Sequence, residues 1–394
     1  MIFQAIAVFL AQLKLRSVPL LLIVCLGLSL VGCSLPQVSA ESRLFLNLSL
    51  SPVGTGLFPP LELTNPAAFS AIAYDRQRDR LYALTNDLSL PQVYAFELHL
   101  NGIGQRDGAE IQLAVESVTP LQNPPAALLA SVDGLALGRQ NTAFMVNTEA
   151  QEQQTLPHLR RFSLTSGTWQ RDLSLPKQYG TSNVASNLDS SSAFGLQPQQ
   201  GFGALSISPD GDRLFAATQG SLRQDIENVG DGTFSYSRLL HYWIGEPESI
   251  LVSEHVYPLE RSLDPATATT LQGIIALDNA GHFLSLEHTT SPNATSDRLY
   301  QFVTGIATDS SGIPQLPPNL ASVVPIIKTP ALTLDPNHLP LQNHWVGFTM
   351  GPYLEDGSKS ILLASYGNQR DTSSSQPVLQ LTVLRLAQSS SRAT

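Results

Sequence analysis

The sequence has little cysteine and little charge. Its 394 residues include 2 Cys, and 14 % of the residues are charged. Both cysteines, Cys25 and Cys33, lie near the N-terminus, so the rest of the chain has no thiol with which to form a disulfide. The folded part must therefore be stabilised by its core alone, for which a hydrophobic content of 42 % is sufficient.

Several motifs of common hydrolases and metalloenzymes are also missing. The sequence contains no Gly-x-Ser-x-Gly nucleophile elbow, no His-Glu-x-x-His zinc motif and no Cys-x-x-Cys pair. The catalytic classes that depend on these motifs are therefore excluded.

Basic residues are outnumbered by acidic ones. The chain has 22 Lys and Arg against 32 Asp and Glu, a formal net charge of −10. If residues 1–32 are removed, Lys14 and Arg16 are lost, and 20 basic residues remain against 32 acidic ones. This balance argues against a nucleic-acid partner and against a basic membrane-binding face, because both need positive charge. It is compatible with cation binding.

An export signal ends at a cysteine. Lys14 and Arg16 precede an apolar run over residues 18–31, and Leu-Val-Gly-Cys occupies positions 30–33. A basic segment followed by a short apolar one is typical of a secretory signal. The last four residues resemble the bacterial lipobox, in which the cysteine is acylated. We therefore expect a lipoprotein signal peptide at residues 1–32 and a lipid on Cys33 that anchors the protein to a membrane of the bacterial cell envelope.

This segment has two other interpretations. A permanent membrane helix needs about 20 apolar residues, and this run is shorter. Cleavage after Val-Ser-Ala at residues 38–40 would instead release a secreted or periplasmic protein that begins at Glu41. Ser34 stands where an Asp would signal retention in the inner membrane. Its presence favours the periplasmic side of the outer membrane.

Short apolar strands separated by turns recur along the rest of the chain. Gly and Pro number 27 each, and β-branched and aromatic runs end at Asp-Gly, Asn-Gly or Pro. This pattern predicts an all-β fold. Five repeat units are visible, each with a small residue at the start of an apolar strand. These small residues are Ala71, Gly134, Ala204, Gly273 and Gly347.

The spacing of the units predicts a β-propeller. Consecutive small residues lie 63, 70, 69 and 74 positions apart, which suits blades of three or four strands. We expect five blades, or six if residues 101–125 or the two termini form another. Residues 44–50 are expected to pair with the last unit and close the ring, because an open sheet edge invites aggregation.

The expected organisation has four segments. The signal peptide covers residues 1–32, a lipid-tethered linker covers 33–42, the propeller covers 43–388 and a flexible tail covers 389–394. We expect the protein to be a monomer.

The repeat units resemble those of the phytase-like family, known by the label "esterase-like activity of phytase". The likeness covers about residues 69–386. It rests on the motifs Gly-Phe-Gly-Ala-Leu at 201–205, Ser-Pro-Asp-Gly at 208–211, Asp-Gly-Leu-Ala-Leu at 133–137, Leu-Ser-Leu-Glu at 284–287 and Gly-Phe-Thr-Met-Gly-Pro at 347–352. The resemblance implies a propeller that hydrolyses phosphoesters with the help of Ca²⁺.

The sequence departs from the family at positions expected to face the axis. Several family units place Glu directly before the small residue. The equivalent residues here are Ser70, Asp133, Gly203, Gln272 and Val346. Only Asp133 is acidic, so we expect hydrolysis to be weakened or lost and Ca²⁺ binding to be weak. Glu at positions 203 and 346 is expected to strengthen Ca²⁺ binding, provided that the axial geometry allows it.

The candidate site is a set of acids at strand ends. Asp133, Glu149, Asp225 and Glu287 are the candidate catalytic residues, and Asp133, Asp225 and Glu287 are the candidate ligands of Ca²⁺, which takes about 6–8 oxygen ligands. Two functions stay open. One is a metal-assisted phosphoester hydrolase acting on a phosphorylated small molecule, and the other is a non-catalytic propeller that binds another envelope component. The fold does not decide between them, because propellers host both.

Overall fold

The computed structural model describes most of the chain after residue 43. It covers residues 44–58, 69–102, 110–122, 129–151, 154–180, 194–197, 200–226, 234–260, 267–292, 294–334, 344–367 and 378–388. Cys33, the signal peptide, the linker and the C-terminal tail lie outside these residues, so the predictions made for them stay predictions. From Phe45 onward the chain is a single unit.

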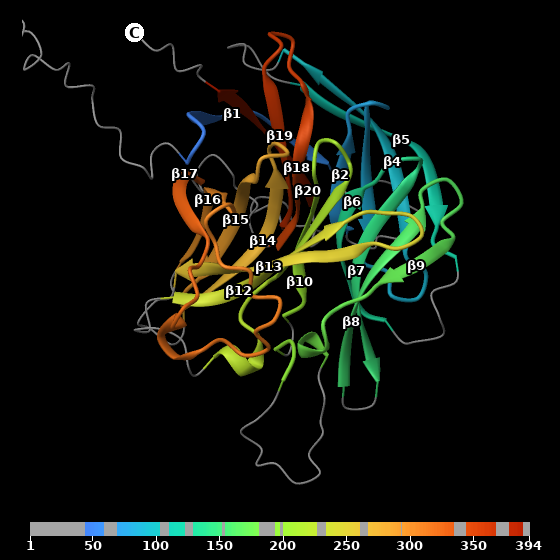
Figure 1. The fold of residues 1–394 in the computed structure, drawn as a ribbon. Coiled ribbons are helices and arrows are strands. Elements are labelled where there is room, and N and C mark those ends of the chain that lie inside the picture. The colour runs from blue at the N-terminus through green and yellow to red at the C-terminus, as the bar shows by residue number, and fades with distance from the viewer. Residues whose placement is uncertain are drawn as a thin grey trace, which may run out of the picture. The chain divides into compact units, whose positions relative to one another are not determined.

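In the described residues, twenty strands form five sheets of four antiparallel strands each (Figure 1). Blade I contains β2 (Phe69–Asp75), β3 (Arg80–Thr85), β4 (Gln92–Asn101) and β5 (Glu110–Pro120). Blade II contains β6 (Leu129–Leu137), β7 (Thr142–Gln151), β8 (Gln154–Ser163) and β9 (Trp169–Leu173). Blade III contains β10 (Phe202–Ile207), β11 (Arg213–Thr218), β12 (Phe234–Trp243) and β13 (Ile250–Glu260).

The last two blades complete the set. Blade IV contains β14 (Ala268–Ala276), β15 (His282–Thr290), β16 (Thr295–Val303) and β17 (Ile327–Leu334). Blade V contains β18 (His344–Tyr353), β19 (Lys359–Gly367), β20 (Val378–Gln388) and the N-terminal strand β1 (Leu48–Phe58). The 3₁₀ helices in the described part of the chain are η2 (Lys177–Tyr179), η3 (Arg223–Asp225) and η4 (Pro318–Leu320).

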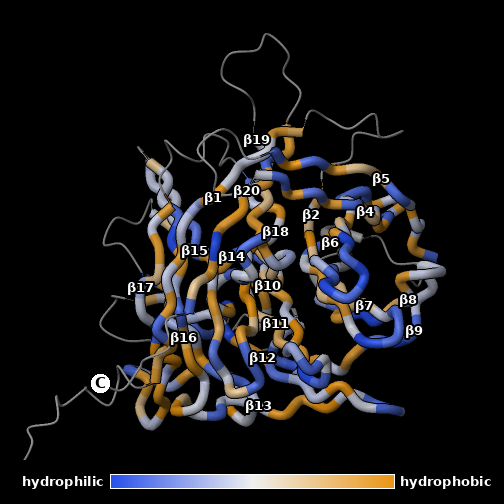
Figure 2. The backbone as a smooth tube through the Cα atoms, turned by 90° about the horizontal axis from the view of Figure 1, so that it is seen from above, coloured by the Kyte–Doolittle hydropathy of each residue, from blue (hydrophilic) through white to orange (hydrophobic). Residues whose placement is uncertain are grey.

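The first strands of the five blades form a closed ring. β2 contacts β6, β6 contacts β10, β10 contacts β14, β14 contacts β18, and β18 contacts β2 again. Figure 2 shows these strands gathered around the centre, with the other strands of each blade farther out. The architecture is therefore a five-bladed β-propeller, which confirms the predicted fold class and decides the blade count. Residues 110–120, considered for a sixth blade, form the outer strand of blade I.

The N-terminal strand closes the ring, as predicted. β1 pairs antiparallel with β20 and becomes the outer strand of blade V. Leu50 of β1 is buried in a cluster with Leu384 and Leu386 of β20. The first and last described strands are therefore joined by backbone hydrogen bonds, so the outer edge of β20 is covered.

Every interface between neighbouring blades has its own apolar core. Phe69 of blade I packs with Val346 of blade V, and Phe202 of blade III packs with Phe144 of blade II. Similar clusters join blades IV and V, III and IV, and I and II. Both faces of a blade's inner strands are therefore buried. This explains why these strands are almost continuously apolar in sequence, without the alternation of a half-exposed strand.

Each inner strand carries a β-bulge near its start. The register shifts lie between Phe69 and Ala71, Asp133 and Leu135, Phe202 and Ala204, Leu271 and Gly273, and Trp345 and Gly347. A bulge inserts one unpaired residue and re-aims its neighbours. The five predicted axial positions thus lie at these bulges, with the unpaired residue of blade II being Gly134.

Small residues are required at this level because the inner strands approach closely. A Cβ atom on Gly203 would lie 2.5 Å from the carbonyl oxygen of Leu271 in the next blade. A Cβ on Gly347 would lie 2.8 Å from the backbone nitrogen of Ile72. Both distances are too short for real contacts, which confirms the predicted crowding around the axis.

Candidate functional site

The axial channel is narrow at the end where the inner strands begin. A cavity of about 60 Å³ lies there, and residues from all five blades line it. The lining includes the five predicted axial residues Ser70, Asp133, Gly203, Gln272 and Val346. The sequence therefore identified the residues that surround the axis. The cavity has room for a few water molecules or a single ion, but not for a large substrate.

Asp133 is the one acid among the described residues that line this narrow cavity. It lies on β6, partly exposed, directly before the bulge at Gly134. The other four axial positions carry two neutral polar side chains, a glycine and a valine. A single carboxylate supplies too few ligands for a Ca²⁺ ion unless backbone and water provide the rest.

The expectation that Glu at positions 203 and 346 would strengthen Ca²⁺ binding stays a prediction, and the packing at both positions opposes it. The backbone of Leu271 blocks any side chain at Gly203. Val346 is 4 % exposed and packs with Phe69 and Ile72 in the core between blades I and V. Val346 therefore borders the narrow cavity but is mostly covered by apolar side chains, which would partly desolvate a carboxylate at this position.

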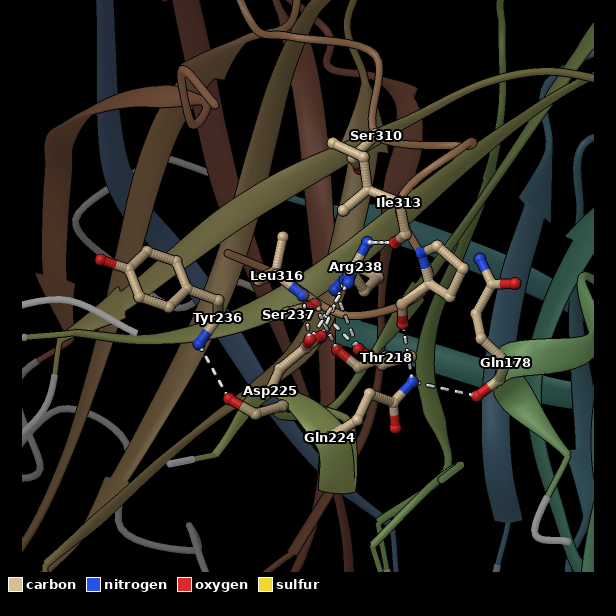
Figure 3. A network of polar contacts seen from close by, with 12 residues as sticks. Gln178, Thr218, Gln224, Asp225, Tyr236, Ser237, Arg238, Ser310, Ile313 and Leu316 are labelled. Carbon is tan, nitrogen blue, oxygen red and sulfur yellow. Dashed lines mark hydrogen bonds and ion pairs between the residues drawn. The ribbon is translucent and has the colours of Figure 1, made fainter. Parts of the chain in front are cut away.

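Asp225 lies in a buried ion-pair network in blade III. It is the last residue of η3, and its carboxylate accepts two hydrogen bonds from Arg238 of β12, at 2.9 and 3.1 Å. Figure 3 shows Arg238 between Asp225 and the carbonyl of Ile313, to which its Nη1 donates at 3.2 Å. The backbone N–H of Leu316 donates to the same carboxylate at 2.8 Å.

A second acid completes this network. Nη1 of Arg238 donates to Glu254 of β13 at 2.5 Å, and the hydroxyl of Tyr179 donates to Glu254 at 2.8 Å. The side chains of Arg238, Asp225 and Glu254 have no exposed surface. Burial raises the pKa of Glu254, and the charge of Arg238 partly offsets that rise. The hydrogen bonds and charges of the two acids outweigh the effect of burial on Arg238 and raise its pKa.

Glu287 lies in a different buried pair in blade IV. Nζ of Lys328 on β17 donates to its carboxylate, and the hydroxyl of Tyr257 donates to the same oxygen at 2.5 Å. Lys328 also lies 4.2 Å from the ring centre of Tyr300. Burial raises the pKa of Glu287, while Lys328 opposes the rise. Burial likewise lowers the pKa of Lys328, while Glu287 opposes the fall.

The candidate residues are thus held in different surroundings. Asp133 lines the axial channel, whereas Asp225 and Glu287 are hydrogen-bonded to different cations in different blades. Glu149 lies on β7, and its side chain falls outside what the structure describes. The role of all four in catalysis stays a prediction.

The described residues do not form a ready metal site. Among them, no group of three or more His, Cys, Asp or Glu side chains is arranged to hold a metal ion. Asp225 and Glu287 accept hydrogen bonds from Arg238 and Lys328, which carry the positive charge that a Ca²⁺ ion would otherwise supply. The described side chains therefore do not fit the Ca²⁺ that the family resemblance implies.

Sequence reasoning missed the buried cations. Arg238 precedes Leu239 and Leu240 in the middle of an apolar strand, and Lys328 follows Ile326 and Ile327. A basic residue inside an otherwise apolar strand is the available signal, because such a charge is buried only with a partner. That signal points to an acid elsewhere without saying which one.

No helix in the described part of the chain is long and apolar enough to cross a membrane.

By its fold the protein is a five-bladed β-propeller. The family model described as "Phytase-like: Esterase-like activity of phytase" matches residues 65–368, which is most of the propeller. The chain therefore belongs to the phytase-like family. No curated protein matches the chain.

Solved structures with a similar arrangement are distant in sequence. A tail fibre of a Staphylococcus aureus phage is 13 % identical, with a TM-score of 0.37, over 88 % of this chain and 55 % of that one. The chain thus spans about half the length of that protein. The Dos1 propeller is 8 % identical, with a TM-score of 0.33, over 80 % of this chain and 68 % of that one. A DUF4221 family member from Bacteroides vulgatus is 11 % identical, with a TM-score of 0.38, over 87 % of this chain and 99 % of that one.

Proposed function

We propose that this protein is a lipid-anchored propeller of the bacterial cell envelope that binds a ligand and hydrolyses phosphoesters weakly or not at all. The observation that carries the proposal is the lining of the narrow axial cavity, in which Asp133 is the one acid among the described residues. Hydrolysis by a metal-assisted route needs several oxygen ligands and an activated water.

The other candidate acids support the same proposal. Asp225 and Glu287 are each hydrogen-bonded to a buried cation, Arg238 and Lys328. An acid in such a pair stabilises the fold around its partner, and binding a metal there would leave the Arg or Lys charge buried without compensation. We therefore assign Asp225 and Glu287 to the structure of blades III and IV.

The catalytic part of the proposal is tested by hydrolysis assays. Phytate and a simple phosphodiester are incubated with the protein in the presence of Ca²⁺ or of a chelator. We expect no chelator-sensitive release of phosphate above that of the Asp133→Asn variant. Robust hydrolysis that needs Ca²⁺ and is lost in Asp133→Asn would overturn the proposal and make the protein an enzyme.

The anchoring part is tested separately. The Leu-Val-Gly-Cys sequence at 30–33 motivates it. Wild-type protein should incorporate labelled palmitate and fractionate with the outer membrane, whereas Cys33→Ala should do neither. A mature protein that begins at Glu41 and takes up no palmitate would show that the protein is secreted without an anchor.

A further inference from the structure

The other segment of the axial channel is wider. A cavity of about 500 Å³ lies where the inner strands end, and residues from all five blades line it. Four apolar residues line both this cavity and the narrow one, and so separate them: Ile72, Leu135, Leu205 and Phe348. Asp133 does not line the wide cavity. The channel therefore has two chemically different ends.

The rim of the wide cavity is basic although the protein is acidic. Its charged lining residues are Asp75, Arg76, Arg78, Arg139, Asp210 and Lys359. Four cations and two acids give the lining a positive balance in a chain whose net charge is −10. Such a local excess attracts anions.

Two of the four cations are neutralised within the protein. Arg78 forms an ion pair with Asp75, and Arg139 forms one with Asp212 at 2.7 Å. The second acid of the rim, Asp210, accepts hydrogen bonds from Ser208 and from the N–H of Asp212 within its own turn. The hydrogen bond from Ser208 is the main reason that the pKa of Asp210 is lowered.

Arg76 has no such acid partner. Its Nε donates to the carbonyl of Gly351 at 2.7 Å, and its guanidinium lies 4.7 Å from the ring centre of Tyr353. These contacts hold the guanidinium of blade I against blade V. Its Nη2 is buried without a hydrogen-bond partner, and among the described residues no carboxylate lies within ion-pair distance of Arg76. A half-buried cation in this state gains free energy from an added anion.

Lys359 supplies a second cation beside it. It is the first residue of β19 and the direct cross-strand partner of Tyr353, whose ring contacts Arg76. Directly opposed residues of antiparallel strands are close neighbours, with Cβ atoms about 5 Å apart. In the described part of the chain Lys359 also forms no ion pair. Arg76 and Lys359 are thus both neighbours of Tyr353, and both line the wide cavity.

We propose that the wide end of the channel binds a small organic anion, whose carboxylate or phosphate group is held by Arg76 and Lys359. A guanidinium matches the planar geometry of carboxylate and phosphate groups, and an ammonium adds a second charge. The apolar walls contact the body of the ligand, and a cavity of about 500 Å³ is within the range of small-molecule sites. The site goes beyond the proposed function, because it lies away from Asp133 and needs no hydrolysis.

Titration calorimetry with three probes tests the proposal. Inorganic phosphate and glucose 6-phosphate represent phosphate ligands, and glucuronate represents sugar carboxylates. At least one probe should bind the wild type, more weakly at high salt. Arg76→Gln and Lys359→Gln should each weaken that binding by about tenfold, the usual effect of losing a hydrogen bond to a charged group. Binding of the two phosphates alone would show that the site takes a phosphate group, and binding of glucuronate alone would show that it takes a carboxylate.

Control variants separate this site from other causes. Arg298→Gln removes an exposed cation of blade IV that pairs with Glu260 and lies outside the cavity, so it should leave binding unchanged. Asp133→Asn should also leave binding unchanged, whatever it does to hydrolysis. If Arg76→Gln lowers the stability of the protein, the binding measured for Lys359→Gln alone tests the proposal. The Lys359 side chain makes no ion pair in the described part of the chain, so its loss should not disturb the fold. No binding of any probe, or binding that Lys359→Gln leaves intact, would overturn the proposal.

Discussion

Arg238 illustrates how this propeller buries a full charge. Its guanidinium has no exposed surface and contacts two acids, Asp225 and Glu254, and the carbonyl of Ile313. Taking three charged groups out of water is costly, and the cost is recovered only while every partner is present. The network therefore ties η3, β12, β13 and the loop around residue 313 to a single arrangement.

Removal of Arg238 is expected to destabilise the protein strongly. Arg238→Met leaves two buried carboxylates without their cation, which should lower the free energy of unfolding by about 3–5 kcal/mol. Urea unfolding followed by circular dichroism measures it. The matched control is Arg298→Met, whose exposed pair with Glu260 should contribute less than about 1 kcal/mol. Equal losses in the two variants would contradict the structural role assigned to this network.

The pair of Glu287 and Lys328 leads to a pH-dependent prediction. Burial raises the pKa of Glu287 above its ordinary value of 4.5, and Lys328 limits that rise. Without Lys328 the pKa of Glu287 should rise further. The folded protein then binds a proton more tightly than the unfolded chain. Its stability is therefore greatest below the ordinary pKa and falls as the pH rises through the raised one.

Lys328→Met should consequently lose more stability at about pH 8 than at about pH 5. Unfolding free energies of wild type and variant at the two pH values measure the difference. In the double variant Glu287→Gln with Lys328→Met, position 287 has no carboxylate to become charged, so the extra loss at high pH should disappear. An extra loss that persists in the double variant would have another origin.

At the scale of elements, the N-terminal strand determines whether blade V is complete. β1 pairs along β20 and buries Leu50 against Leu384 and Leu386. Its removal would expose both the hydrogen-bonding edge of β20 and part of its apolar face. Exposed apolar edges associate with other chains.

Deletion of residues 1–58 should therefore lower the melting temperature and cause self-association. Differential scanning calorimetry and size-exclusion chromatography with light scattering measure the two effects. A chain that lacks residues 1–43 but keeps β1 is the control, and it should stay monomeric with the melting temperature of the full propeller. A monomeric, equally stable protein without β1 would show that ring closure contributes little.

At the scale of the whole molecule, five blades fit around one axis because their inner strands approach closely. Gly203 lies where the backbone of Leu271 in the next blade leaves no space for a Cβ. Gly203→Ala should therefore push blades III and IV apart at the axis and cost about 1–3 kcal/mol, as overpacking usually does. A Cβ on Gly312 would meet no atom of the described residues within 4 Å, so Gly312→Ala is the control and should be nearly neutral. Thermal unfolding of both variants tests this, and equal stability would argue against crowding at the axis.

The strand order and the axial residues could largely be predicted from the sequence. Repeat spacing, small residues at the start of each unit and an apolar N-terminal segment were enough to predict a propeller closed by residues 44–50. The physical reason is that every blade packs its inner strand between two neighbouring blades, so the same pattern of small and apolar residues recurs. The blade count stayed open between five and six, because a fourth strand such as β5 is mostly exposed and carries a weak apolar pattern.

The partners of buried charges were decided by the tertiary structure alone. The sequence marked Asp225 and Glu287 as notable, but only the fold brings Arg238 and Lys328 to them and makes those acids part of ion pairs. Likewise, Arg76 of blade I contacts the ring of Tyr353 of blade V only because the propeller closes. Local patterns in a sequence record propensity and periodicity. The tertiary structure decides which charged groups pair and whether a glycine has room for a side chain. Both depend on elements that are distant in the chain and meet only when the ring closes.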